Sequence, residues 1–297
     1  MTQPWEGTFT AIVTPFQSDG SPDETALRAL VDRQVAGGVS GLVPCGTTGE
    51  GATMSNDEKI RVIDIVRDQS DGRARVLAGA GGNSTRDVIA LAKQIDALSV
   101  DGVLIVVPYY NKPTQEGLYQ HFSAVADAVQ TPVVMYNVPG RTSANMNAET
   151  ALRLAEHANI AGTKEASGSL AQVMEIVTNA PSDFAVLSGE DDLTLPIITL
   201  GGSGVVSVVS NEVPDIMSAM VRAAIDGRVA DARELHYKLL GLMQLNFIET
   251  NPIPVKAALA MMGLIEEHYR LPLVPMADAN RDRLRVELAK LQLVEAV

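Results

Sequence analysis

The chain has 297 residues, 46% of them apolar and 20% charged, which is typical of a globular protein with a large buried core. The 23 Lys and Arg against 36 Asp and Glu give a formal charge of −13, which argues against nucleic acid or an anionic membrane as a partner. The chain shows no signal-peptide pattern, no run long enough to span a membrane and no metal-ligand spacing among its histidines, so we expect a cytoplasmic protein without a zinc site.

Short apolar runs recur along the first three quarters of the chain. Because their apolar residues stand at consecutive positions, we interpret them as strands buried on both faces. The runs occupy residues 10–13, 41–45, 75–78, 103–107, 132–136, 160–163, 185–187 and 205–209.

Amphipathic segments with helix-start and helix-stop signals separate these runs. Residues 21–24 and 55–58 both match a capping box, the first with Pro22 at the first helical position. Residues 37–38 and 71–72 hold the glycines expected just after a helix. Eight strand–helix units in series predict an α/β fold, a closed (β/α)8 TIM barrel; an open doubly wound sheet is the alternative.

The strand pattern stops near residue 225, which predicts two parts. Residues 1–225 would form the catalytic barrel, and 226–297 a C-terminal helical domain packed on it. Within the second part we expect helices over 229–243, 254–262 and 278–293.

Lys164 is the most informative polar residue, because it follows a predicted strand and so should stand at the carboxyl-end mouth of the barrel. Burial there favours a neutral amine, which can attack a ketone and form a Schiff base. The alternative is a structural lysine paired with a carboxylate such as Glu165. Lys256 is a second lysine among apolar residues, but it lies in the C-terminal part and we interpret it as a helix-surface or helix-dipole residue.

Two more polar residues follow the fifth run. Tyr136 should lie beside Lys164, where its hydroxyl could pass a proton; the alternative is a core tyrosine with a satisfied hydroxyl. Arg141 lies in a Pro-Gly turn, where it could clamp a carboxylate or remain a solvated loop residue.

The second run ends in a glycine-rich turn. Thr47 and Thr48 offer two hydroxyls, and the flanking glycines allow close backbone approach to a carboxylate; a plain strand–helix turn is the alternative. The pattern of a phosphate-binding loop is absent. The single cysteine, Cys45, is interpreted as a small buried residue rather than a nucleophile, because no histidine lies near it among the strand ends.

Together these segments resemble the dihydrodipicolinate synthase family of class I pyruvate-dependent aldolases, over nearly the whole chain. The resemblance is carried by residues 11–15, 46–50, 108–113, 136–142, 162–166, 204–208 and 251–256, which read AIVTP, GTTGE, PYYNKP, YNVPGRT, GTKEA, GVVSV and NPIPVK.

The resemblance implies a lyase of lysine and diaminopimelate biosynthesis that condenses pyruvate with L-aspartate 4-semialdehyde to 4-hydroxy-tetrahydrodipicolinate. Lys164 would form the Schiff base and Tyr136 would move protons, linked through Thr47 to Tyr110 of a neighbouring subunit in a homotetramer, a dimer of dimers. No metal or organic cofactor would be needed. The implied substrate-binding residues are Thr48, Arg141, Gly189 and the backbone at Val206.

Two alternatives remain at this point. Relatives within the superfamily cleave N-acetylneuraminate or keto-deoxy sugar acids with the same lysine and tyrosine, although Arg141 suits a shorter, carboxylate-bearing partner. The other alternative is a keto-acid binding protein without turnover.

The resemblance also bears on feedback control. Lysine-sensitive relatives bind lysine near positions matching Gly51, Asn56, Lys59, Asn83, Asp87 and Tyr109. Sensitive relatives often place histidine where this chain has Lys59, and a second cation would repel the ligand, so we expect weak or no inhibition by lysine.

Overall fold

The computed structural model describes residues 5–295. Its strands form a closed parallel barrel in which each strand pairs with the next and β8 pairs with β1. Phe9 of β1 is opposite both Gly41 of β2 and Val206 of β8, which confirms the predicted barrel and excludes the open sheet. The strands are β1 (Gly7–Thr10), β2 (Gly41–Leu42), β3 (Arg75–Gly79), β4 (Gly102–Val106), β5 (Val133–Asn137), β6 (Ile160–Glu165), β7 (Ala185–Ser188) and β8 (Gly204–Ser207).

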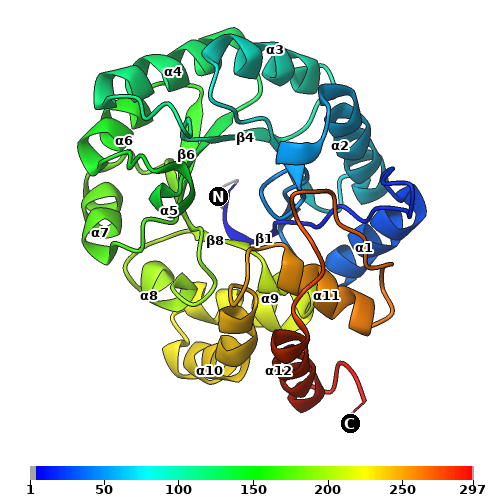
Figure 1. The fold of residues 1–297 in the computed structure, drawn as a ribbon. Helices are drawn as coiled ribbons and strands as arrows, with labels where there is room; N and C mark the ends of the chain where they lie inside the picture. Colours follow the sequence, from blue (N-terminus) through cyan, green and yellow to red (C-terminus); the bar gives the residue numbers. More distant parts are fainter. Residues whose placement is uncertain (1–4, 296–297) are drawn as a thin grey trace.

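The helices surround the strands as a ring, with the last helices lying beside α1, α8 and α9 (Figure 1). Those of the barrel are α1 (Glu24–Ala36), α2 (Asn56–Ser70), α3 (Thr85–Asp96), α4 (Gln115–Ala128), α5 (Pro139–Thr142), α6 (Ala148–Ala155), α7 (Leu170–Asn179), α8 (Thr194–Thr199) and α9 (Pro214–Ile225). Short 3-10 turns, η1 (Gly51–Thr53) and η2 (Val209–Asn211), follow β2 and β8. None of the helices within residues 5–295 combines the length and hydropathy that a membrane crossing requires.

The strands divide the buried apolar side chains into two layers. Along β4, Leu104 points into the barrel, where it belongs to an inner cluster with Phe9 and Leu187. Its neighbours Val103 and Ile105 belong instead to the layer between strands and helices. This alternation follows from the two-residue period of a strand and fills the barrel with side chains, leaving its carboxyl-end mouth for a site.

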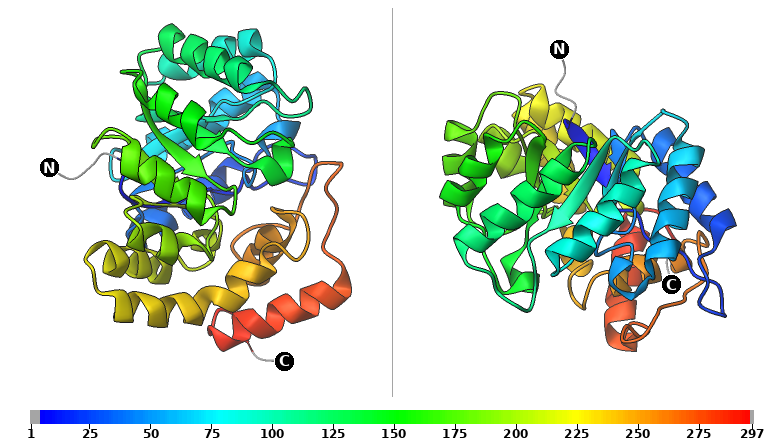
Figure 2. Two further views of the ribbon diagram at one scale, coloured as in Figure 1. Left: turned by 90° about the vertical axis from the view of Figure 1, so that its left-hand side faces the viewer. Right: turned by 90° about the horizontal axis from the view of Figure 1, so that it is seen from above.

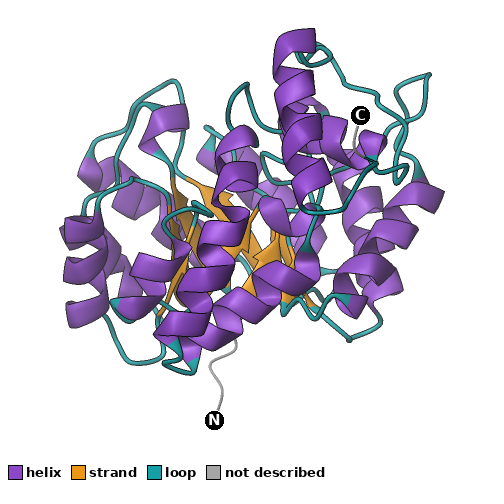
Figure 3. Cartoon of the chain, turned by 90° about the horizontal axis from the view of Figure 1, so that it is seen from below, coloured by secondary structure: helices purple, strands orange, loops and turns teal. Residues whose placement is uncertain are grey.

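Three further helices, α10 (Val229–Leu245), α11 (Ile253–Met261) and α12 (Asp278–Lys290), follow the barrel. Leu239 of α10 and Leu284 of α12 are fully buried in one apolar cluster with Met217 of α9. Figure 2 shows α10 in yellow and α12 in red close together near the C-terminus, and Figure 3 shows the strands flanked by helices. The predicted helices of this part are present, with ends that differ by one to three residues.

Three predicted strands end two or three residues before their apolar runs do. β2 stops at Leu42, because Pro44 has no N–H to donate and Cys45 has a left-handed backbone with a φ of 58°. The first strand covers Gly7–Thr10 rather than 10–13, since the N–H of Val13 donates to the side chain of Asn211 instead of to a strand.

The last apolar run, 205–209, also extends beyond its strand. β8 ends at Ser207, and the N–H groups of Val208 and Val209 donate to the carboxylate of Asp191 at 3.0 and 2.9 Å.

The helix caps follow the prediction in α2 and depart from it in α1. Ser55 and Glu58 form the expected capping box. The predicted box at 21–24 is wrong, because Asp23 is the N-cap of α1 and its carboxylate accepts from the N–H of Ala26 at 3.0 Å. The side chain of Ser21 instead donates to Asp19.

Candidate active site

Lys164 and Tyr136 stand opposite each other on adjacent strands. The register pairs Tyr136 of β5 with Lys164 of β6, and both side chains are buried, with relative exposures of 7% and 6%. The Nζ atom of Lys164 lies 4.1 Å from the centroid of the Tyr136 ring. The structure therefore brings together the two residues that the sequence singled out most strongly.

Burial dominates the electrostatics of Lys164. Loss of hydration lowers the pKa of its ammonium to about 7, and the positive charge of Arg141 lowers it too. The charges of Asp191 and Glu190 oppose this effect without cancelling it. A substantial fraction of the amine is consequently neutral near pH 7.

The alternative that Lys164 is a structural lysine paired with Glu165 is wrong. Successive residues of β6 point to opposite faces, and the Glu165 carboxylate accepts from Asn137, Gln172 and the backbone N–H of Ser167. Within residues 5–295, no carboxylate lies within ion-pairing distance of the Lys164 ammonium.

Tyr136 has a buried hydroxyl with a polar partner. Burial raises the pKa of this phenol to about 12, and a hydrogen bond with Thr47 together with the charge of Arg141 works in the opposite direction. The phenol is protonated at neutral pH and can exchange its proton only through a neighbouring group. Thr47, from the turn after β2, is placed to be that group.

A cavity of about 580 Å³ opens above these residues. Arg141 borders it from α5, a four-residue helix where a Pro-Gly turn was expected, and its side chain is exposed. The predicted site residues that line the cavity are Lys164, Tyr136, Thr47, Thr48, Arg141 and Gly189.

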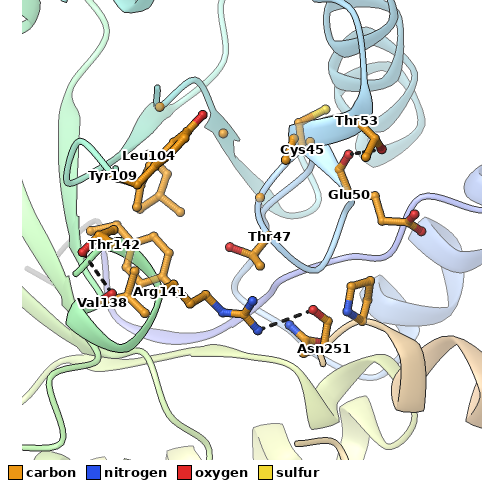
Figure 4. A pocket seen from close by; sticks show the side chains of 18 of the residues that line it. Cys45, Thr47, Glu50, Thr53, Leu104, Tyr109, Val138, Arg141, Thr142 and Asn251 are labelled. Atoms are coloured by element: carbon orange, nitrogen blue, oxygen red, sulfur yellow. Dashed lines mark hydrogen bonds between the residues drawn. The ribbon is translucent and has the colours of Figure 1, made fainter. Parts of the chain in front are cut away.

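A second cavity of about 380 Å³ shares Thr47, Tyr136 and Arg141 with the first (Figure 4). Its wall includes Lys59 and Tyr109. Thr47, Tyr136 and Arg141 therefore border both cavities.

Two predicted site residues lie apart from the cavity. Tyr110 is 88% exposed, has a left-handed backbone with a φ of 76°, and does not line the space around Lys164. The side chain of Val206 is buried inside the barrel, in one cluster with Tyr136. The predicted contact of Tyr110 with a neighbouring site stays a prediction.

Cys45 is buried, as expected, and burial raises the pKa of its thiol to about 12. The thiol is therefore fully protonated at neutral pH and is no nucleophile.

The interpretation of Lys256 as a helix-surface residue is wrong. Its side chain is completely buried and its ammonium forms an ion pair with Glu50, from the turn after β2. The physical reason is that α11 is buried on every side from Ile253 to Leu259. The apolar composition of this helix was the available signal, since a lysine in such a helix needs a buried partner.

Sequence reasoning assigned no role to Asn251, which joins several parts of the site. Its side-chain Nδ2 donates to the hydroxyl of Thr48 at 3.0 Å. Its backbone carbonyl oxygen accepts from the guanidinium of Arg141 at 3.4 Å (Figure 4). Asp191 was also missed; it is buried close to Lys164 and influences its charge.

Comparison with known proteins agrees with this arrangement. The model of the dihydrodipicolinate synthetase family matches residues 4–291. The chain belongs to this family. A 4-hydroxy-tetrahydrodipicolinate synthase of Koribacter versatilis is 55% identical over 279 residues, which cover 94% of this chain and 93% of the relative. The synthase of Chloroherpeton thalassium is 49% identical over 98% of this chain and 96% of its own length.

Solved structures of the family share the fold. The chloride-inhibited dihydrodipicolinate synthase from Acinetobacter baumannii, complexed with pyruvate, superposes with a TM-score of 0.96 at 42% identity, over 97% of this chain and 99% of that one.

Proposed function

We propose that this chain is a 4-hydroxy-tetrahydrodipicolinate synthase, which condenses pyruvate with L-aspartate 4-semialdehyde through a Schiff base on Lys164. One observation carries the proposal: a buried amine with a pKa of about 7 lies 4.1 Å from a phenol ring at the mouth of a barrel. The relative from Acinetobacter baumannii, which was solved with pyruvate bound, supports the choice of the first substrate.

The first half of the reaction uses the neutral amine. Nζ of Lys164 adds to the ketone carbon of pyruvate, and Tyr136 passes protons so that the ketone oxygen leaves as water. The resulting iminium withdraws electrons from the methyl carbon, which loses a proton and gives an enamine.

In the second half, the enamine carbon attacks the aldehyde carbon of the semialdehyde and a carbon–carbon bond forms. The aldehyde oxygen takes up a proton and becomes a hydroxyl. The amino group of the semialdehyde then adds to the imine carbon and displaces Lys164, which closes the ring. One water is released for each pair of substrates.

The remaining site residues are proposed to bind and to relay protons. Arg141 holds the carboxylate of the semialdehyde, since a guanidinium is suited to bidentate pairing. Thr48, Gly189 and the backbone at Val206 contact pyruvate. Thr47 connects Tyr136 with Tyr110 of a neighbouring subunit, so we propose a homotetramer as the active form. The exposure of Tyr110, at 88%, leaves it free to enter another protomer.

Trapping with borohydride tests the function. Incubation with pyruvate and borohydride should attach the reduced adduct to Lys164, located by mass spectrometry, and the Lys164→Ala variant should carry none. Rates with aspartate semialdehyde and N-acetylneuraminate then separate this function from a sugar-acid aldolase. An adduct on a residue other than Lys164, or an absence of turnover with the semialdehyde, would contradict the proposal.

A further inference from the structure

The turn that carries Thr47 and Thr48 lies between two residues with left-handed backbone. Cys45 has a φ of 58° and Glu50 a φ of 52°. Residues other than glycine keep this conformation only where surrounding contacts hold them. The N–H of Glu50 donates to the carbonyl oxygen of Thr47 at 3.1 Å. A contact that fixes the position of Glu50 therefore also fixes that of Thr47. The hydroxyl of Thr47 is hydrogen-bonded to Tyr136.

The C-terminal part of the chain binds both carboxylate oxygens of Glu50. Oε1 accepts from Nζ of Lys256, and Oε2 accepts from the backbone N–H of Arg270 at 3.3 Å. The side chains of Glu50 and Lys256 have no exposed surface, and the ammonium lies 4.5 Å from the centroid of the Phe16 ring. Separating the two groups would leave an uncompensated buried charge, so the ion pair fixes the position of both.

Asn251 provides a second connection between the same parts of the chain. It is 4% exposed, its side-chain amide nitrogen donates to the hydroxyl of Thr48, and its backbone carbonyl oxygen accepts from Arg141. The C-terminal segment thus contacts the catalytic turn at both Thr48 and Glu50, on either side of Gly49.

We propose that Glu50 and Lys256 are a positioning pair for this turn, through which the C-terminal helices hold Thr47 in the geometry that relays protons to Tyr136. Asn251 acts in the same way on Thr48. Neither Glu50 nor Lys256 lines the cavity around Lys164, so the pair acts through the turn. The inference rests on the proposed Schiff-base function, and it extends the site beyond the barrel to residues of α11 and of the segment that precedes it.

A double-mutant cycle on the rate of Schiff-base formation tests this inference. Samples with pyruvate are quenched with borohydride at timed intervals, and the adduct on Lys164 is quantified by mass spectrometry. The paired variant Glu50→Gln/Lys256→Met removes both charges together and so leaves no lone charge buried. We expect it to slow adduct formation by about tenfold to a hundredfold, because a displaced relay residue has effects of this size.

The decisive comparison is with Thr47→Val. If the pair acts through Thr47, adding Thr47→Val to the paired variant causes little further loss, because the effects of residues that act as one unit are not additive. Effects that multiply, or an unchanged rate in the paired variant, overturn the inference. Lys290→Met is the matched control: it removes an ion pair with Glu287 within α12, where neither residue bonds to the turn, and should leave the rate as in the parent protein.

The test also covers a variant that does not fold and a parent protein that forms no adduct. If the paired variant does not fold, the same cycle is run with Asn251→Ala and Thr48→Val, where additive effects overturn the inference and non-additive effects support it. If the parent protein itself forms no adduct, the proposed function fails and the inference fails with it. An adduct in the parent protein with additive losses in the variants overturns the inference alone.

Discussion

The ammonium nitrogen of Lys164 faces the ring of Tyr136 at 4.1 Å, and the two residues are directly opposite in the register of β5 and β6. A full positive charge on Lys164 would be attracted to the ring face, whereas the chemistry needs the free amine. Burial favours the free amine near neutral pH.

Schiff-base formation should depend on pH through Lys164. The neutral form is the nucleophile, so at limiting pyruvate the initial trapping rate should fall about tenfold for each pH unit below the pKa. Since burial places this pKa at about 7, the rate should level off above that pH. Timed borohydride quenching between pH 5 and 10 measures the profile. A rate that keeps rising toward pH 10 would show an unperturbed lysine.

Removing Lys164 should stabilise the protein. Its pKa is about 7 in the folded protein and 10.5 for a fully hydrated lysine, so the unfolded state binds the proton more tightly. The resulting destabilisation is complete below pH 7 and declines as pH rises toward 10.5. Lys164→Met should therefore raise the free energy of unfolding at about pH 6 by up to roughly 5 kcal/mol, and by less at about pH 9. Denaturant unfolding at the two pH values measures this; equal effects at both would contradict it.

Replacing Arg141 should weaken the binding of aspartate semialdehyde but not the reaction with pyruvate. Arg141→Met should raise the KM for aspartate semialdehyde by about tenfold to a hundredfold, because a charge-assisted bond of about 1.5–3 kcal/mol is lost. The adduct with pyruvate should still form. Since the charge of Arg141 lowers the pKa of Lys164, the midpoint of its pH profile should move upward in this variant. A defect confined to pyruvate binding would contradict the assignment.

Tyr110 can be tested by mixing two impaired chains. If it enters a neighbouring site, a dimer of one Lys164→Ala chain and one Tyr110→Phe chain contains one complete site. Co-expression of the two variants should therefore restore activity above that of either alone. No recovery, with mixed dimers shown by native mass spectrometry, would contradict a shared site.

Lysine should inhibit this protein weakly or not at all. Lys59 lines the second cavity, where its charge would repel the ammonium groups of lysine. Initial rates measured with increasing L-lysine test this, and inhibition at submillimolar concentration, which corresponds to about −4 kcal/mol or tighter, would contradict it. The variant Lys59→His should be the more sensitive of the two proteins.

Much of the site was predictable because, in a TIM barrel, consecutive strands are neighbours and their carboxyl ends lie together at one mouth. Once the apolar runs are strands of one barrel, Lys164 and Tyr136 must meet at its mouth. Contacts that join distant segments were not predictable in this way. Nothing in the spacing of Glu50 and Lys256 indicates that they form a buried ion pair, and the role of Asn251 depends on how the C-terminal segment folds back over β2.

The ends of the strands could not be predicted for the same reason, since they also depend on contacts with other segments. Apolar character predicts burial, and Ile12 and Val13 are buried as expected although they lie outside β1. Whether a residue belongs to a strand is decided by where its N–H and C=O groups find partners. For Val13 and Val208 those partners are side chains of other segments, 198 and 17 positions away in the sequence.

Pairing of β1 with β8 has a consequence for biosynthesis. Thr8 is bonded into the sheet beside Val205, so the first strand leaves the ribosome long before the strand that completes it. Until then the nascent chain carries an open, apolar sheet edge, the kind of surface that promotes aggregation. Closure of the barrel must therefore be a late event, and truncation anywhere before β8 would leave two unpaired edges exposed in the cell.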